Sequence, residues 1–179
     1  AEKEKQRSES RIIVTGGFGY IGRSLVALFQ TKFPTVALSH DKVDLVAGAV
    51  ELDLLAQKHD ATHIVHLATP RDFGKNSALG DSVSMLKNVL DVCSANKLKL
   101  LFVSSADVFS GFVEYPLQAT ENHAPFPRNS PGVAKYLCEI MIRQHASVHG
   151  LSWAVLRSAT IYGGAVRRPK FLHTFIEQV

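Results

Sequence analysis

Three glycines near the start of the chain have the spacing of a loop that receives phosphate groups. Gly16, Gly19 and Gly22 stand in the segment GGFGYIG, between an apolar run and an apolar helical pattern. The first glycine permits a tight turn out of a strand, the second lets a pyrophosphate approach the backbone, and the third lets the helix pack closely. The amino end of that helix offers N–H groups and a positive dipole end to phosphates. The segment is therefore predicted to hold the pyrophosphate of a dinucleotide.

The residues after the second apolar run concern the ribose of that dinucleotide. In dinucleotide-binding α/β folds, an acid at the end of the second strand binds the ribose hydroxyls of NAD, whereas a basic residue accommodates the 2′-phosphate of NADP. Asp41 could bind the hydroxyls, but His40 and Lys42 on either side could equally face a phosphate. The sequence predicts a cofactor-binding role for Asp41 and leaves the choice between NAD and NADP open.

The elements that must position these residues follow from the alternation of short apolar runs with helical patterns, which predicts βαβ units. Strands are predicted over 11–15, 35–38, 63–68, 98–104 and 153–160, helices over 22–33, 81–96 and 131–149, and a short helix or turn over 52–59. Ser130 is predicted as the N-cap of the last helix, with Pro131 at its first position. The fold class is therefore α/β, a Rossmann-type doubly wound parallel sheet.

Composition and charge exclude several other classes of protein. Hydrophobic residues make up 46% of the 179 residues, which is enough for a sizeable core. The net charge of +4 suits an anionic ligand, but no basic block or aromatic-interleaved patch predicts nucleic-acid binding. No apolar run reaches the roughly 18 residues of a membrane span. Cys93 and Cys138 lie in apolar helical patterns and are predicted as buried free thiols, which favours a reducing, cytoplasmic location.

Other groupings of reactive residues predict no further site. His59, His63 and His66 straddle a helix end and a strand, and the last two point to opposite faces of that strand. No metal site is therefore predicted. Ser105 lacks the GxSxG elbow of a serine hydrolase.

Five segments, in this order, resemble the extended short-chain dehydrogenase/reductases: TGGFGYIG, HLAT, FVSSADVF, PGVAK and LRSATIYGG. These enzymes are NAD-dependent sugar-nucleotide epimerases, dehydratases and reductases. The resemblance therefore implies NAD or NADP as cofactor and a small-molecule substrate, a nucleotide sugar or a related hydroxyl or carbonyl compound. It also suggests a homodimer.

The resemblance also assigns roles to particular residues. Ser105 matches the hydroxyl that orients the substrate oxygen, and Lys135 matches the lysine that holds the nicotinamide ribose and lowers the pKa of a catalytic tyrosine. Further matches to cofactor-binding positions are Tyr20 and Ile21 at the pyrophosphate, Asp53 at the adenine with Leu54 beside it, and Leu67, Ala68 and Thr69 under the ribose.

One departure affects the expected chemistry. Four residues before Lys135, where the family has its tyrosine, stands Pro131. Three explanations remain open: the tyrosine was lost naturally, it was removed from the sequence of an ordinary enzyme, or the helix slips so that Tyr136, Tyr115 or Tyr162 substitutes. The first leads to a non-catalytic dinucleotide-binding module as the alternative function.

The chain divides into three parts on this interpretation. Residues 1–10 form a charged tail or linker without the apolar core of a signal peptide. Residues 11–165 form the NAD(P)-binding domain. Residues 166–179 are the expected start of a substrate-binding lobe that is largely absent.

Overall fold

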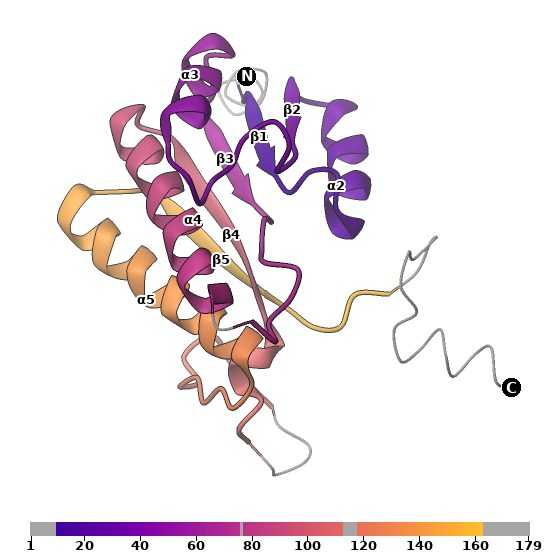
Figure 1. Cartoon of the computed structure of the whole chain (residues 1–179), viewed down its shortest axis with the longest axis vertical. Coiled ribbons are helices and arrows are strands. Elements are labelled where there is room, and N and C mark those ends of the chain that lie inside the picture. Colours follow the sequence, from indigo (N-terminus) through magenta and orange to yellow (C-terminus); the bar gives the residue numbers. More distant parts are fainter. Residues whose placement is uncertain (1–9, 76, 113–117, 163–179) are drawn as a thin grey trace, which may run out of the picture.

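Five short strands form one parallel sheet in a computed structural model that describes residues 10–75, 77–112 and 118–162 (Figure 1). Their order across the sheet is β2-β1-β3-β4-β5, and each neighbouring pair is parallel. Because the strands are parallel, their carboxyl ends meet at one edge of the sheet. The strands are β1 (Ile12–Thr15), β2 (Thr35–Leu38), β3 (His63–His66), β4 (Lys99–Ser105) and β5 (Trp153–Ser158).

Helices cover both faces of the sheet. Helix α2 packs on one face, and α3, α4 and α5 lie on the other (Figure 1). A 3₁₀ turn, η1, continues directly from β4. The bounds are α2 (Tyr20–Gln30), α3 (Val50–Lys58), α4 (Ser77–Ala95), η1 (Ala106–Phe109) and α5 (Ser130–His149). The predicted doubly wound α/β fold is confirmed.

The core follows the alternation of side chains along each strand. Ile12 and Val14 of β1 pack with Val26 of α2, while Ile13 between them packs in the larger cluster under α3, α4 and α5. Since both faces of β1 are buried, its sequence is a continuous apolar run.

Several predicted boundaries differ from the structure. Helix α2 begins at Tyr20, and β3 ends at His66. The predicted N-cap of α5, Ser130, is wrong: Asn129 is the N-cap, and its side chain accepts a hydrogen bond of 2.8 Å from the Gly132 amide. Sequence spacing did not distinguish these two residues, because both side chains are suitable caps.

Parts of the predicted domain division lie outside the described residues. These are residues 1–9 and 163–179, so the tail and the start of a further lobe remain predictions. Within the described part of the chain, no helix is long and apolar enough to cross a membrane.

Candidate functional site

The glycine-rich segment forms the turn between β1 and α2 at the carboxyl edge of the sheet. Gly16 has a φ of 70°, which side chains rarely adopt. A Cβ at Gly22 would clash with the carbonyl oxygen of Gly16, so a glycine there lets α2 approach the turn. Gly19 is exposed and its missing Cβ would meet only one atom, the Gly16 oxygen, at 3.1 Å. This open side of the loop is where the sequence predicts the pyrophosphate.

The amino end of α2 is built to receive an anion. Its N-cap is Gly19, which supplies no side-chain hydrogen bond, and the first turn contains no acidic residue. The Arg23 amide donates to the Gly19 carbonyl at 3.1 Å. The amides of Ile21 and Gly22, just before Arg23, donate to no backbone acceptor among the described residues. A helix end of this kind suits a phosphate, so the segment fits a dinucleotide.

The segment after β3 lies directly against the glycine loop. A Cβ at Gly16 would come within 2.8 Å of the Ala68 amide nitrogen. Leu67 packs into the apolar cluster beneath α2, and Thr69 is exposed. Ala68 and Thr69 line a small hollow that also contains Lys135 from α5. The structure therefore brings the predicted pyrophosphate and ribose segments to one edge with the predicted lysine.

His66 is a buried residue of this edge that sequence reasoning did not assign to it. Its Nδ1 lies 2.7 Å from the Thr15 hydroxyl, and its ring stacks on Phe102 at 5.8 Å. Burial, with a smaller effect from the charge of Lys135, lowers its pKa to about 3. The imidazole is therefore neutral and joins the ends of β1 and β3 beneath the hollow.

Lys135 projects from α5 over the end of β4. Its Nζ donates a 2.7 Å hydrogen bond to the Val103 carbonyl and lies 4.7 Å from the centre of the Phe102 ring. Burial lowers its pKa, and the charges of Cys138 and Glu139 oppose that effect. The ammonium retains further N–H groups with which it can hold a ligand.

Ser105 ends β4 and caps η1. Its hydroxyl donates to the Asp107 carboxylate at 2.9 Å and accepts from the Asp107 amide at 3.1 Å. Asn129 also donates to Asp107, at 3.3 Å, which connects the cap to the start of α5. Ser105 and Lys135 are thus set by adjoining elements, β4 and α5.

Below Lys135, a buried carboxylate connects α5 to β4 and β5. Glu139, one helical turn further along α5, is fully buried and accepts a 2.6 Å hydrogen bond from Ser104. Arg157 of β5 donates to both of its carboxylate oxygens, with a shortest distance of 2.8 Å. The sequence analysis did not predict this pair. The position of Glu139 on the apolar side of a helix could have indicated a buried acid that needs a cation.

A model of the NAD dependent epimerase/dehydratase family matches residues 12–179. The chain belongs to this family. The predicted resemblance is therefore confirmed.

The chain resembles curated sugar-nucleotide enzymes in sequence and solved complexes with NAD or NADP in fold. The chain is 26% identical over 172 residues to a putative UDP-glucose 4-epimerase of Methanocaldococcus jannaschii, covering 85% of this chain and 56% of that protein. A UDP-glucose 4-epimerase of Thermus thermophilus in complex with NAD superposes with a TM-score of 0.74, at 22% identity over 82% of this chain and 54% of that one. A dTDP-4-dehydrorhamnose reductase of Bacillus anthracis in complex with NADP gives 0.75, at 22% identity over 94% and 59%. The family description names NAD, and both NAD and NADP occur in solved structures that share this fold.

The chain spans about half the length of the curated relatives that it matches.

Asp53 and Leu54, which the resemblance assigned to the adenine, lie in α3. The Asp53 carboxylate accepts from Asn96 at 2.6 Å and from Gln57 at 2.8 Å. Asn96 precedes β4, at the amino edge of the sheet and away from the loop. Leu54 beside it is 60% exposed.

Asp44 is an acid nearer the site that sequence reasoning passed over. It lies in the segment after the carboxyl end of β2, between the buried residues Val43 and Leu45. Its carboxylate accepts from the amides of residues 46 and 47, at 2.9 and 3.3 Å. The alternation of two apolar residues around an acid was the signal that could have found it.

The position of the missing tyrosine is well defined. Pro131 lies one helical turn before Lys135, and the next residue, Gly132, packs so closely on the Asp107 carbonyl that a Cβ would clash. Tyr136 lies close enough to Arg157 to raise that residue's pKa, after the larger effect of the Glu139 hydrogen bond. The other tyrosines named above are Tyr162, which is 70% exposed, and Tyr115, which lies outside the described residues.

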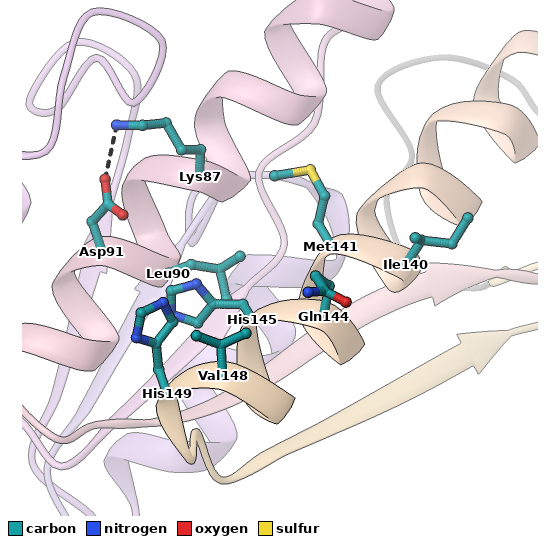
Figure 2. Close-up of a pocket in the computed structure, with 9 residues that line it drawn as sticks. All are labelled: Lys87, Leu90, Asp91, Ile140, Met141, Gln144, His145, Val148 and His149. Atoms are coloured by element: carbon teal, nitrogen blue, oxygen red, sulfur yellow. Dashed lines mark hydrogen bonds and ion pairs between the residues drawn. The ribbon is translucent and has the colours of Figure 1, made fainter.

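A larger hollow, of about 370 Å³, lies away from this edge between α4 and α5 (Figure 2). Figure 2 shows His145 and His149 side by side there, with ring centres 4.3 Å apart. Burial and the charge of His149 lower the pKa of His145. In the described ranges, no three metal-binding side chains gather at this or any other point.

Proposed function

We propose that the chain is the cofactor-binding part of an NAD(P)-dependent epimerase, dehydratase or reductase that acts on a nucleotide sugar or a related hydroxyl or carbonyl compound. The observation that carries the proposal is the continuous edge from Gly16 through Ala68 to Lys135. Along it lie a helix end suited to phosphates and, on the far side of Ala68, the partly buried ammonium of Lys135. The substrate class rests on the family and on the names of its relatives.

The side chains have distinct roles in this proposal. The bound dinucleotide supplies hydride transfer to or from the substrate carbon. Lys135, held over the end of β4, would donate hydrogen bonds to the nicotinamide ribose. Ser105 would exchange its hydrogen bond to Asp107 for one to the substrate oxygen. No general base stands in the usual place, because Pro131 has no titratable group.

A second candidate function follows from that proline. A module that binds the cofactor without turnover, as a sensor or scaffold, would keep the glycine loop and dispense with the base. General-base catalysis contributes roughly 100-fold or more to rate, so the loss of the tyrosine leaves at most slow turnover. The retained Ser105 and Lys135 favour the enzyme over the module.

The test is titration of the chain with NAD(H) and NADP(H), followed by thermal unfolding and calorimetry. Ligand binding to the folded state raises the free energy of unfolding, by about 2.7 kcal/mol at a ligand concentration of 100 times Kd. The melting temperature therefore rises. Gly22→Ala should abolish this shift, because its Cβ clashes with the Gly16 carbonyl. Gly80→Ala, in α4 with nothing within 4 Å of the added Cβ, is the matched control and should bind normally. No shift with any of the four ligands would overturn the proposal.

The proposal extends to a homodimer and a cytoplasmic location. The outer side of α5 exposes Ile140 at 43% and Val148 at 63%, beside the hollow in Figure 2, which suits contact with a second copy. Cys93 and Cys138 are unpaired, and burial raises their pKa values to about 12 and 11. Such thiols suit a reducing compartment.

A further inference from the structure

The turn that follows β2 folds back against the glycine loop. The Ser39 carbonyl accepts from the amides of Lys42 and Val43, both at 3.1 Å. The Gly17 amide donates to the Leu38 carbonyl at 3.0 Å and fastens the loop to the end of β2. The two segments therefore form one surface, beside the open side of the loop.

Two cations converge on one residue of that surface. The Nζ of Lys42 lies 5.9 Å from the centre of the Phe18 ring, at cation–π distance. From the other element, the Nε of Arg23 donates to the Phe18 carbonyl at 3.0 Å. This contact leaves the terminal nitrogens of the guanidinium without a partner among the described residues. All three side chains are solvent-accessible, so a ligand can reach both cations.

The acids of the same turn are less well placed to meet a ribose. The hydrogen bond from Lys42 to Ser39 makes Asp41 a central residue of the turn, at its exposed corner. Asp44 is held by its own backbone and lies 3.8 Å from His40. Directly after β2, where an acid would bind the ribose hydroxyls, stands Ser39, which carries no charge.

We infer that Arg23 and Lys42 form a subsite for the 2′-phosphate of NADP(H), so that the chain prefers NADP(H) to NAD(H). The inference rests on the proposed function, because it needs the dinucleotide in the glycine loop. Arg23 would offer a planar pair of donors and Lys42 a point charge to the phosphate oxygens. NAD(H), with hydroxyls alone at this point, would gain nothing from either cation.

The experiment is calorimetric titration of the chain with NADP⁺, NAD⁺, 2′,5′-ADP and 5′-AMP. The parent chain should bind NADP⁺ at least about tenfold more tightly than NAD⁺, since hydrogen bonds to charged groups contribute about 1.5–3 kcal/mol. The preference should weaken as salt is added. Lys42→Gln and Arg23→Gln should each weaken NADP⁺ binding about tenfold or more and leave NAD⁺ binding within about twofold.

Lys32→Gln is the matched control, because it removes the same charge from an exposed residue just past the other end of α2. It should leave all four affinities unchanged. Equal or tighter binding of NAD⁺, or unchanged NADP⁺ binding in both variants, would overturn the inference while the proposed function stands. Failure of every dinucleotide to bind would overturn both.

Discussion

Replacing Glu139 by glutamine should destabilise the chain by several kcal/mol. The carboxylate is fully buried, and the change removes the charge that compensates Arg157. Breaking a buried pair in this way costs about 3–5 kcal/mol. The Arg157 side chain is 18% exposed, so water compensates it in part, and the lower end of about 3 kcal/mol applies. At about 2–4 °C per kcal/mol for a chain of this size, the melting temperature should fall by about 6–12 °C.

Thermal and urea unfolding of three variants would test this reasoning. Glu139→Met combined with Arg157→Met removes both charges and should recover most of the loss, because an apolar pair of similar volume leaves no buried charge. Arg143→Met removes a partner that is 44% exposed and 3.7 Å from the carboxylate, so it should cost less than about 1 kcal/mol. A loss under 1 kcal/mol for Glu139→Gln, or a double variant no more stable than the single one, would refute the argument.

Two further predictions concern the edge of the sheet. Because burial lowers the pKa of His66 from 6.5 to about 3, its contribution to stability is complete above pH 6.5 and is lost as the pH falls towards 3. Urea unfolding should show this slope, at most about 1.4 kcal/mol per pH unit, and His66→Gln should flatten it; an unchanged slope would contradict the assignment. Pro131→Tyr should raise hydride transfer by roughly 100-fold with a panel of nucleotide sugars, measured by reduced-nicotinamide absorbance, with little change in cofactor affinity. Equal rates in parent and variant would count against Lys135 as the partner of a base.

The fold could be predicted because the apolar residues of the sequence follow the positions that are buried in each strand and helix. The apolar run at β1 is continuous because α2 covers one face and α3 and α4 the other. The glycine spacing was equally informative, since two of the three glycines meet a local steric need: positive φ at Gly16 and helix contact at Gly22. Patterns of this kind depend on neighbours along the chain, and sequence alone displays them.

The ribose and adenine side of the site depends on contacts between distant segments. Asp53 follows β2 at a plausible distance, yet its helix turns it towards Asn96, 43 residues further along the chain. The turn at residues 39–43 likewise determines that Lys42, and not Asp41, meets the loop. Spacing could name the candidates but could not choose between them, because the choice is made by a backbone turn and by packing across elements.

The register of α5 decides how Pro131 should be interpreted. Gly132 fits against the Asp107 carbonyl, and the side chain of Asn129 receives its amide. A slip of one residue would place Val133 against that carbonyl, where its Cβ has no room. It would also separate Glu139 from Arg157 and leave the buried carboxylate without its cation. These contacts argue against Tyr136 as a substitute base. They also make a single replacement at position 131 the direct test, since it restores a phenol one turn before Lys135 without moving any of these partners.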